Sequence, residues 1–169
     1  LVPTLVVTNS ADLQKTMQKL YGYPQLVMDR LAAARAEHVA SCRRAIDAGV
    51  TICTGTDNLP SDPVGGTWST TREVELLVDA GMTPLEAIKA GTYNSAKLCG
   101  IEKVTGSLYE GLEADFLVVD GKPDVEIQDL RNMRMVCRGS RTAWSEIDGC
   151  RYHAPYSDTE SILGQLRAW

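Results

Sequence analysis

Asp57 is the residue of this sequence whose type and position best suit chemistry. It directly follows an apolar, β-branched run at 50–54 and precedes a loop rich in Asn, Pro, Ser and Gly. A carboxylate at the carboxyl end of a buried parallel strand can take a proton from an attacking water and pass it to a leaving group. An Asp in this context can equally cap the following turn through its side chain. The residues alone leave both interpretations open.

The other residues that could bind a metal or act as nucleophiles are few and scattered. His38 falls on the apolar side of a predicted helix, which favours a core or partly buried histidine, and His153 lies in an aromatic segment that favours a surface position. The five cysteines are Cys42, Cys53, Cys99, Cys137 and Cys150. They are widely spaced and form no CxxC pair, so we expect free thiols in a reducing, cytoplasmic compartment.

The charge balance restricts the classes of partner. The 169 residues contain 17 Lys and Arg against 22 Asp and Glu, a formal net charge of −5. An acidic chain with no basic run is not expected to bind nucleic acid or anionic lipid. Charged residues also interrupt every apolar stretch before it reaches the roughly 18 residues of a membrane span. We therefore expect neither a nucleic-acid nor a membrane partner.

The spacing of apolar residues predicts alternating strands and helices in the first hundred residues. Strands are predicted at 4–8 and 50–54, and helices at 11–20, 24–48, 70–80 and 84–97. Thr83-Pro84-Leu85-Glu86 is a capping box with proline at the first helical position. Glycines at 49, 81 and 100 mark helix ends. Further along, short strands are predicted within 106–111, at 114–119 and at 133–139, with a weak final helix from 158.

Two β/α units cannot close a barrel, which takes eight. The absence of an initiator Met or a signal peptide before Leu1 indicates a chain that starts within a domain. We expect either a piece of a larger barrel or a chain that completes itself with a partner. Open parallel edges predict that the isolated chain folds poorly or self-associates.

Four segments resemble the metal-dependent amidohydrolase superfamily in order and spacing. Residues 49–57 (GVTICTGTD) are similar to its final barrel strand, and 76–88 (LLVDAGMTPLEAI) to the segment that follows. Residues 92–100 (TYNSAKLCG) are similar to the next helix, and 106–121 (GSLYEGLEADFLVVDG) to the return into a β-sandwich. The likeness is greatest to imidazolonepropionase-like and Xaa-Pro dipeptidase (prolidase)-like enzymes.

The resemblance implies an α/β fold: the last two β/α units of a (β/α)8 TIM barrel, followed by closing strands of a small β-sandwich domain. We accordingly expect the barrel portion at 1–105, sandwich strands at 106–142 and a tail at 143–169. The loop from 58 to 67 could line a substrate cleft or be a plain connection, so no substrate-binding residue is predicted in it.

In the family that the chain resembles, one or two divalent metal ions, commonly zinc, are held by histidines and an Asp after the last strand. Asp57 matches that Asp, which implies both a metal contact and a catalytic proton shuttle. The histidine ligands, including a His-x-His pair, have no counterpart here. Because a zinc centre needs three or four ligands, we expect no metal in the isolated chain and no activity from it.

The resemblance thus implies part of a hydrolase that cleaves carbon–nitrogen bonds in a small molecule, either a cyclic amide or imide or a proline-containing dipeptide. Metal-activated water would be the nucleophile. The expected partner is a missing N-terminal half or a second copy of the chain. The alternative is a non-catalytic scaffold or a split-barrel subunit that binds a complementary chain.

Overall fold

The structure, a computed structural model, describes residues 1–57 and 65–147. The predictions made for the loop at 58–64, for Cys150 and His153, and for a final helix from 158 lie outside these residues.

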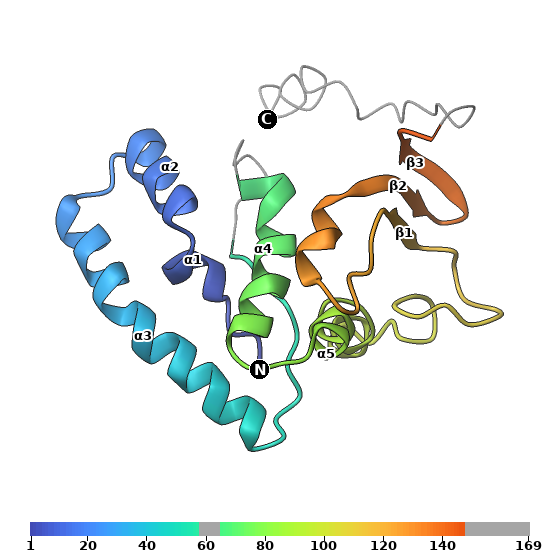
Figure 1. Ribbon diagram of the computed structural model, residues 1–169, viewed down its shortest axis with the longest axis horizontal. Helices are drawn as coiled ribbons and strands as arrows, with labels where there is room; N and C mark the ends of the chain where they lie inside the picture. The colour runs from blue at the N-terminus through green and yellow to red at the C-terminus, as the bar shows by residue number, and fades with distance from the viewer. Residues whose placement is uncertain (58–64, 148–169) are drawn as a thin grey trace.

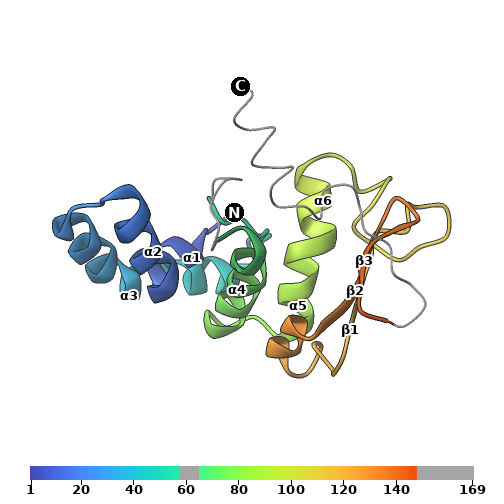
Figure 2. The ribbon, with the colours of Figure 1, turned by 90° about the horizontal axis from the view of Figure 1, so that it is seen from above.

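Helices precede a small sheet along the described residues. The elements follow in the order α1 (Leu5–Asn9), α2 (Ala11–Tyr21), α3 (Gln25–Asp47), α4 (Gly65–Asp79), α5 (Pro84–Lys89), the π-helical turn η1 (Ala90–Asn94), α6 (Ser95–Leu98), β1 (Phe116–Val119), the 3-10 turn η2 (Ile127–Arg131), β2 (Met133–Arg138) and β3 (Arg141–Ser145). In Figure 1, α1 to α3 lie on one side of α4 and the three strands on the other. Figure 2 shows α5, η1 and α6 as one continuous helix between α4 and the sheet.

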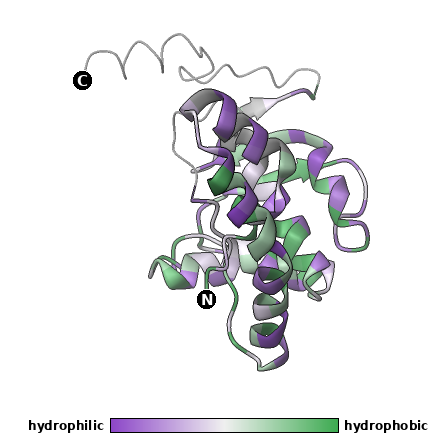
Figure 3. Ribbon diagram, turned by 90° about the vertical axis from the view of Figure 1, so that its left-hand side faces the viewer, coloured by the Kyte–Doolittle hydropathy of each residue, from purple (hydrophilic) through white to green (hydrophobic). Residues whose placement is uncertain are grey.

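The helix starts and ends follow local signals. The capping box forms as predicted: the Glu86 N–H donates to Thr83 Oγ1 at 3.3 Å, and the Thr83 N–H donates to Glu86 Oε2 at 2.8 Å. At the end of α3, Gly49 has a φ of +72°, a left-handed backbone that glycine adopts without a Cβ clash. The glycines after α4 and α6 likewise have positive φ. Each helix carries both hydrophilic and hydrophobic residues (Figure 3).

The strand predicted at 4–8 is wrong, because residues 5–9 form helix α1. The carboxylate of Glu73 accepts the backbone N–H groups of Leu5 and Val6, at 2.9 and 2.7 Å, and so satisfies two of the donors that a helix N-terminus leaves unpaired. At the other end, the Thr8 carbonyl accepts bonds from the Gln14 and Arg35 side chains. These tertiary contacts outweigh the strand preference of the β-branched run.

The prediction of a strand at 50–54 is also wrong, since the segment forms no continuous ladder with another described residue. It makes two backbone bonds to Leu1, whose amino group donates to the Thr51 carbonyl at 2.8 Å and whose carbonyl accepts the Cys53 N–H at 2.9 Å. Leu1 thus bonds to the residues before and after Ile52, which is the hydrogen-bond pattern of a parallel pair of strands. Ile52 and Cys53 are buried, whereas Val50 and Thr51 are exposed.

The described sheet is an antiparallel meander in the order β1-β2-β3. Phe116 pairs with Cys137 in the first ladder, and Val136 pairs with Trp144 in the second. Strands β1 and β2 confirm the predictions at 114–119 and 133–139. The strand expected within 106–111 is absent there, and β3 was not predicted.

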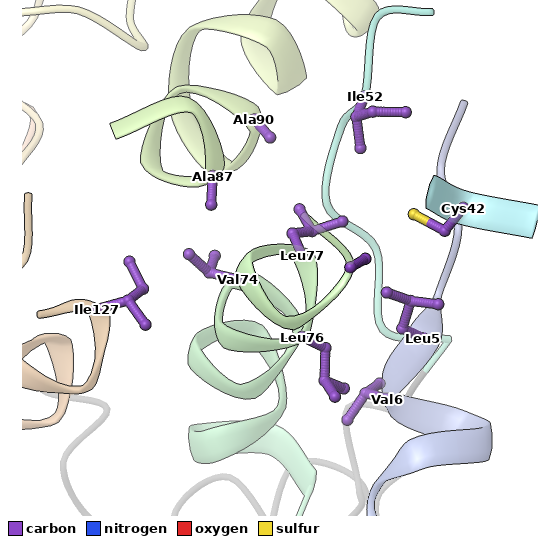
Figure 4. Packing of buried hydrophobic residues seen from close by; sticks show 11 residues of the cluster. Leu5, Val6, Cys42, Ile52, Val74, Leu76, Leu77, Ala87, Ala90 and Ile127 are labelled. Atoms are coloured by element: carbon purple, nitrogen blue, oxygen red, sulfur yellow. The ribbon is translucent and has the colours of Figure 1, made fainter. Parts of the chain in front are cut away.

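Among the described residues, a hydrophobic cluster joins α1, α3, α4, α5, η1 and η2. Figure 4 shows Leu76 and Leu77 of α4 between α1 on one side and α5 on the other. The buried members are Leu5, Val6, Cys42, Ile52, Val74, Leu76, Leu77, Ala80, Ala87, Ala90 and Ile127. Ile127 belongs to η2, so the connection between β1 and β2 packs against the same core as the helices.

The mixed helix and strand content agrees with the predicted α/β class, while the division into barrel, sandwich and tail stays a prediction. Among the described residues, no helix is both long enough and apolar enough to cross a membrane.

Candidate active site

Asp57 lies at the end of the segment that pairs with Leu1. Its side chain is exposed, and no described residue forms a hydrogen bond or an ion pair with it. Its φ of +53° is left-handed, which is uncommon for a residue other than glycine and better tolerated by Asp and Asn than by other types. Such backbone positions cluster at functional sites. The geometry leaves an exposed carboxylate at the end of a segment in which Ile52 and Cys53 are buried.

Close packing against residues 1–4 holds the segment before Asp57. At Gly55 a Cβ atom would overlap the Val2 side chain and would come within 3.7 Å of Thr4 Oγ1. Only a residue without a side chain therefore allows this approach. Together with the two backbone bonds of Leu1, the contact fixes 51–55 beside the first residues of the chain.

Glu73 is a second carboxylate in this region, and its side chain is completely buried. Burial raises the pKa of Glu73 above its ordinary value, although the N–H groups of Leu5 and Val6 act in the opposite direction by stabilising the charged form. Both oxygens are used by these backbone donors. The arrangement makes Glu73 a structural cap for α1, and this role links α4 to the start of the chain.

Sequence reasoning did not single out Glu73, which lies in the helix predicted at 70–80. The spacing carried a signal, since Glu73 lies three and four residues before Leu76 and Leu77, both fully or nearly fully buried. Residues at these spacings share a helix face. An acidic residue on that face needs a buried donor, and the donors here are about 68 residues away in the sequence.

His38 is half-buried, as the sequence predicted, and both of its ring nitrogens have partners inside the protein. Its Nε2 lies 2.7 Å from the Pro3 carbonyl, which can only accept, so Nε2 carries a proton. Its Nδ1 lies 2.8 Å from Thr8 Oγ1. With both nitrogens engaged, the ring ties α3 to the start of the chain and has no free position for a metal.

The described residues do not form a metal site by themselves. No three His, Cys, Asp or Glu side chains in 1–57 and 65–147 lie close enough to hold an ion together. A catalytic zinc takes three protein ligands. The four described cysteines are free, and three of them, Cys42, Cys53 and Cys137, are buried. Asp57 could contribute one ligand, so its predicted metal contact and catalytic role stay predictions.

Comparison with known proteins identifies the family. The model of the amidohydrolase family matches residues 4–147, most of the chain. The chain therefore belongs to the amidohydrolase family, and the resemblance found in the sequence is confirmed.

Individual relatives are consistent with the same assignment. The chain is 38% identical over 109 residues to an ochratoxinase from Aspergillus niger, covering 63% of the chain and 22% of that protein. It is 37% identical over 84 residues to an imidazolonepropionase from Geobacillus kaustophilus, covering 47% of the chain and 18% of that protein. A solved Xaa-Pro dipeptidase with methionine bound in its active site matches with a TM-score of 0.67 and 29% identity, covering 83% of the chain and 33% of the dipeptidase.

The chain covers only part of the length of each of these relatives. The chain spans about a fifth of the length of the two curated relatives and about a third of the solved dipeptidase. Any activity that depends on the remaining length of such proteins is a matter of proposal for this chain.

Proposed function

We propose that the chain is part of a hydrolase that cleaves carbon–nitrogen bonds in small molecules, with Asp57 as the proton shuttle. The observation that carries the proposal is the position of Asp57: an accessible carboxylate with left-handed backbone at the end of the segment that packs beside residues 1–4. Membership of the amidohydrolase family supports it.

The proposed chemistry of Asp57 is a balanced proton transfer. A water oxygen forms a bond to the substrate carbonyl carbon, and the proton that it releases passes to a carboxylate oxygen of Asp57. The same proton is then donated to the nitrogen as the carbon–nitrogen bond breaks, which lets the amine leave neutral and returns Asp57 to its charged form. An exposed carboxylate suits both steps.

The remaining metal ligands would have to come from other polypeptide, because the described residues offer Asp57 and no companion cluster. The isolated chain is accordingly proposed to be inactive. Metal analysis of the purified chain in zinc-containing buffer should find no tightly bound zinc in a one-to-one ratio, and stoichiometric tight zinc would contradict this part of the proposal.

The substrate class is proposed from relatives whose names state their reactants. A proline-containing dipeptide or a cyclic amide or imide fits a prolidase-like or imidazolonepropionase-like enzyme. In both classes the leaving nitrogen is an amide or ring nitrogen that needs a proton when its bond to carbon breaks.

A mixing experiment tests the activity. The chain is combined, in zinc-containing buffer, with a polypeptide that supplies the first six β/α units of an amidohydrolase, and hydrolysis of Xaa-Pro dipeptides and of a cyclic imide is measured. We expect activity in the mixture, and a loss of about 100-fold or more in Asp57→Asn, the typical range for removing a general acid–base group. Asp124→Asn, which removes the same charge from an exposed position, is the control and should retain activity.

The second candidate is a non-catalytic subunit of a split barrel. The lack of a metal-binding cluster among the described residues favours it. A stable complex with the supplied units that hydrolyses nothing, or one whose hydrolysis is unchanged by Asp57→Asn, would favour this function over the first.

A further inference from the structure

The π-helical turn η1 places two polar residues next to the segment that leads to Asp57. A widened turn within a helix is rare and is often found near functional sites. Here it lies at Ala90–Asn94, between α5 and α6. The Ser95 hydroxyl donates to the Ala90 carbonyl at 2.7 Å, so the side chain that follows the turn satisfies a carbonyl at its start.

Asn94 forms a direct bond to this segment. Its Nδ2 donates to the Ile52 carbonyl at 2.9 Å, a contact between residues 42 positions apart. Next to it, Ser95 Oγ lies 3.4 Å from Thr54 Oγ1. The first contact reaches the backbone carbonyl of Ile52, and the second reaches the side chain of Thr54, two residues further along the segment. Asn94, the last residue of the turn, and Ser95, the first residue of α6, thus contact the segment at two positions.

The bond from Asn94 complements the bonds made by Leu1. In an extended segment the backbone groups of successive residues point to opposite edges, and those of alternate residues point to the same edge. Those of Thr51 and Cys53 bond to Leu1, so the Ile52 carbonyl points to the other edge of the segment. The Asn94 amide supplies the donor that a neighbouring strand would otherwise provide there.

The close approach of η1 to the segment requires a small residue in the turn. A Cβ atom at Gly91 would lie 3.3 Å from Val74 Cγ2 and 3.5 Å from Thr54 Cγ2. Glycine at position 91 therefore lets the turn lie close to α4 and to the segment at the same time.

We propose that Asn94 is a positioning residue, which fixes the segment 52–57 and thereby the place of the Asp57 carboxylate. The catalytic part of this inference, the placing of Asp57, rests on the proposed function. The other part, that Asn94 holds the segment through its bond to the Ile52 carbonyl, rests on the structure alone. An amide suits the task because it supplies an N–H donor to the Ile52 carbonyl without a charge that would have to be buried. Asn94 does not act on substrate itself.

Hydrogen exchange on the purified 169-residue chain tests whether Asn94 holds the segment, and this measurement requires no enzymatic activity. The probe is the Cys53 amide, which bonds to Leu1 on the opposite edge from Asn94. Asn94→Asp, which keeps the size of the side chain but removes the donor, and Asn94→Ala should each speed exchange of this amide about tenfold, as expected for one lost hydrogen bond. Thr92→Val, which removes a hydroxyl of the same turn that bonds only within the helix, should not.

Two results would contradict the proposal that Asn94 holds the segment. One is an unchanged exchange rate at Cys53 in both Asn94 variants. The other is an equal acceleration at the Val136 amide of β2, which would show a general loss of stability and no specific hold on the segment.

Kinetics of the mixed assembly separate this inference from the proposed function. If Asn94 positions Asp57, then Asn94→Ala should lower kcat about tenfold with little change in KM, and Thr92→Val should leave both unchanged. A change in KM alone would contradict a positioning role. If the mixture with unaltered chain is inactive, the proposed function fails, while the exchange measurement still decides whether Asn94 holds the segment.

Discussion

Arg131 binds the buried carboxylate of Glu75 through both oxygens, with Nε 2.5 Å from Oε1 and a terminal nitrogen 2.6 Å from Oε2. The two residues come from η2 and α4 and are 56 positions apart. Only 1% of the Glu75 side chain is exposed, and Arg72 bonds to the same carboxylate at 2.9 Å. Burial alone would raise the pKa of Glu75, but the two guanidinium groups outweigh it and hold the pKa below its ordinary value. The ion pair therefore joins the β1–β2 connection to the helical core.

Removal of Arg131 should leave Glu75 as a buried charge with one partner. We expect Arg131→Ala to lower the free energy of unfolding by about 1–3 kcal/mol, less than for a fully buried pair, because 44% of the Arg131 side chain is exposed and Arg72 remains bound to Glu75. Urea denaturation followed by circular dichroism measures it. Arg44→Ala, which breaks the exposed pair with Glu37, is the control and should cost much less than Arg131→Ala. Equal losses of unfolding free energy in the two variants would mean that the Arg131–Glu75 pair stabilises the fold no more than an exposed pair does.

The raised pKa of Glu73 predicts a pH dependence of stability. The native state binds a proton between the ordinary value of 4.5 and the raised value, where the unfolded state has released it. This contribution is therefore complete below the unfolded pKa and is lost as the pH rises through the folded pKa. The free energy of unfolding of the unaltered chain should fall relative to that of Glu73→Gln as the pH rises above 4.5. Urea midpoints at several pH values test this, with exposed Glu126→Gln as the control, and parallel curves for Glu73→Gln would contradict it.

The capping box of α5 should contribute measurably to stability although it is exposed. Thr83→Ala removes the Oγ1 acceptor for the Glu86 N–H and the hydroxyl that donates to the Glu86 carboxylate at 2.7 Å. We expect a loss of about 1 kcal/mol, the usual cost of an N-cap substitution. Thr70→Ala, at an exposed position inside α4, should be neutral or slightly stabilising, since alanine favours helix. Thermal unfolding of both variants separates a lost cap from a general effect of alanine.

Elements with local signals could be predicted from the sequence. The start of α5 depends on four adjacent residues, and the end of α3 depends on Gly49 and the carbonyls of the preceding turn. These signals act within a few residues, so they work regardless of the rest of the fold. Periodicity likewise predicted α3 closely, because its apolar residues Val39, Cys42 and Ile46 pack into the core cluster.

The elements decided by distant contacts could not be predicted. The segment 5–9 has the composition of a strand, yet it is a helix because the Glu73 carboxylate caps it from about 68 positions away. In the candidate site, Asp57 was found through its place after an apolar run and through the family resemblance. Its left-handed backbone and the Asn94 contact to Ile52 depend on packing that no local pattern records.

The contact between Gly55 and Val2 gives a last prediction about the segment that carries Asp57. Gly55→Ala would force its methyl group into the Val2 side chain, so residues 1–3 and 51–55 would have to separate. We expect a loss of about 1–3 kcal/mol in the free energy of unfolding, the usual cost of overpacking, together with faster exchange of the Cys53 amide as its bond to the Leu1 carbonyl weakens. Val2→Ala in the same chain removes the overlapping methyl groups and should restore part of both losses, a coupling that independent sites do not show. Additive effects of the two substitutions would mean that the strain of Gly55→Ala arises elsewhere than against Val2.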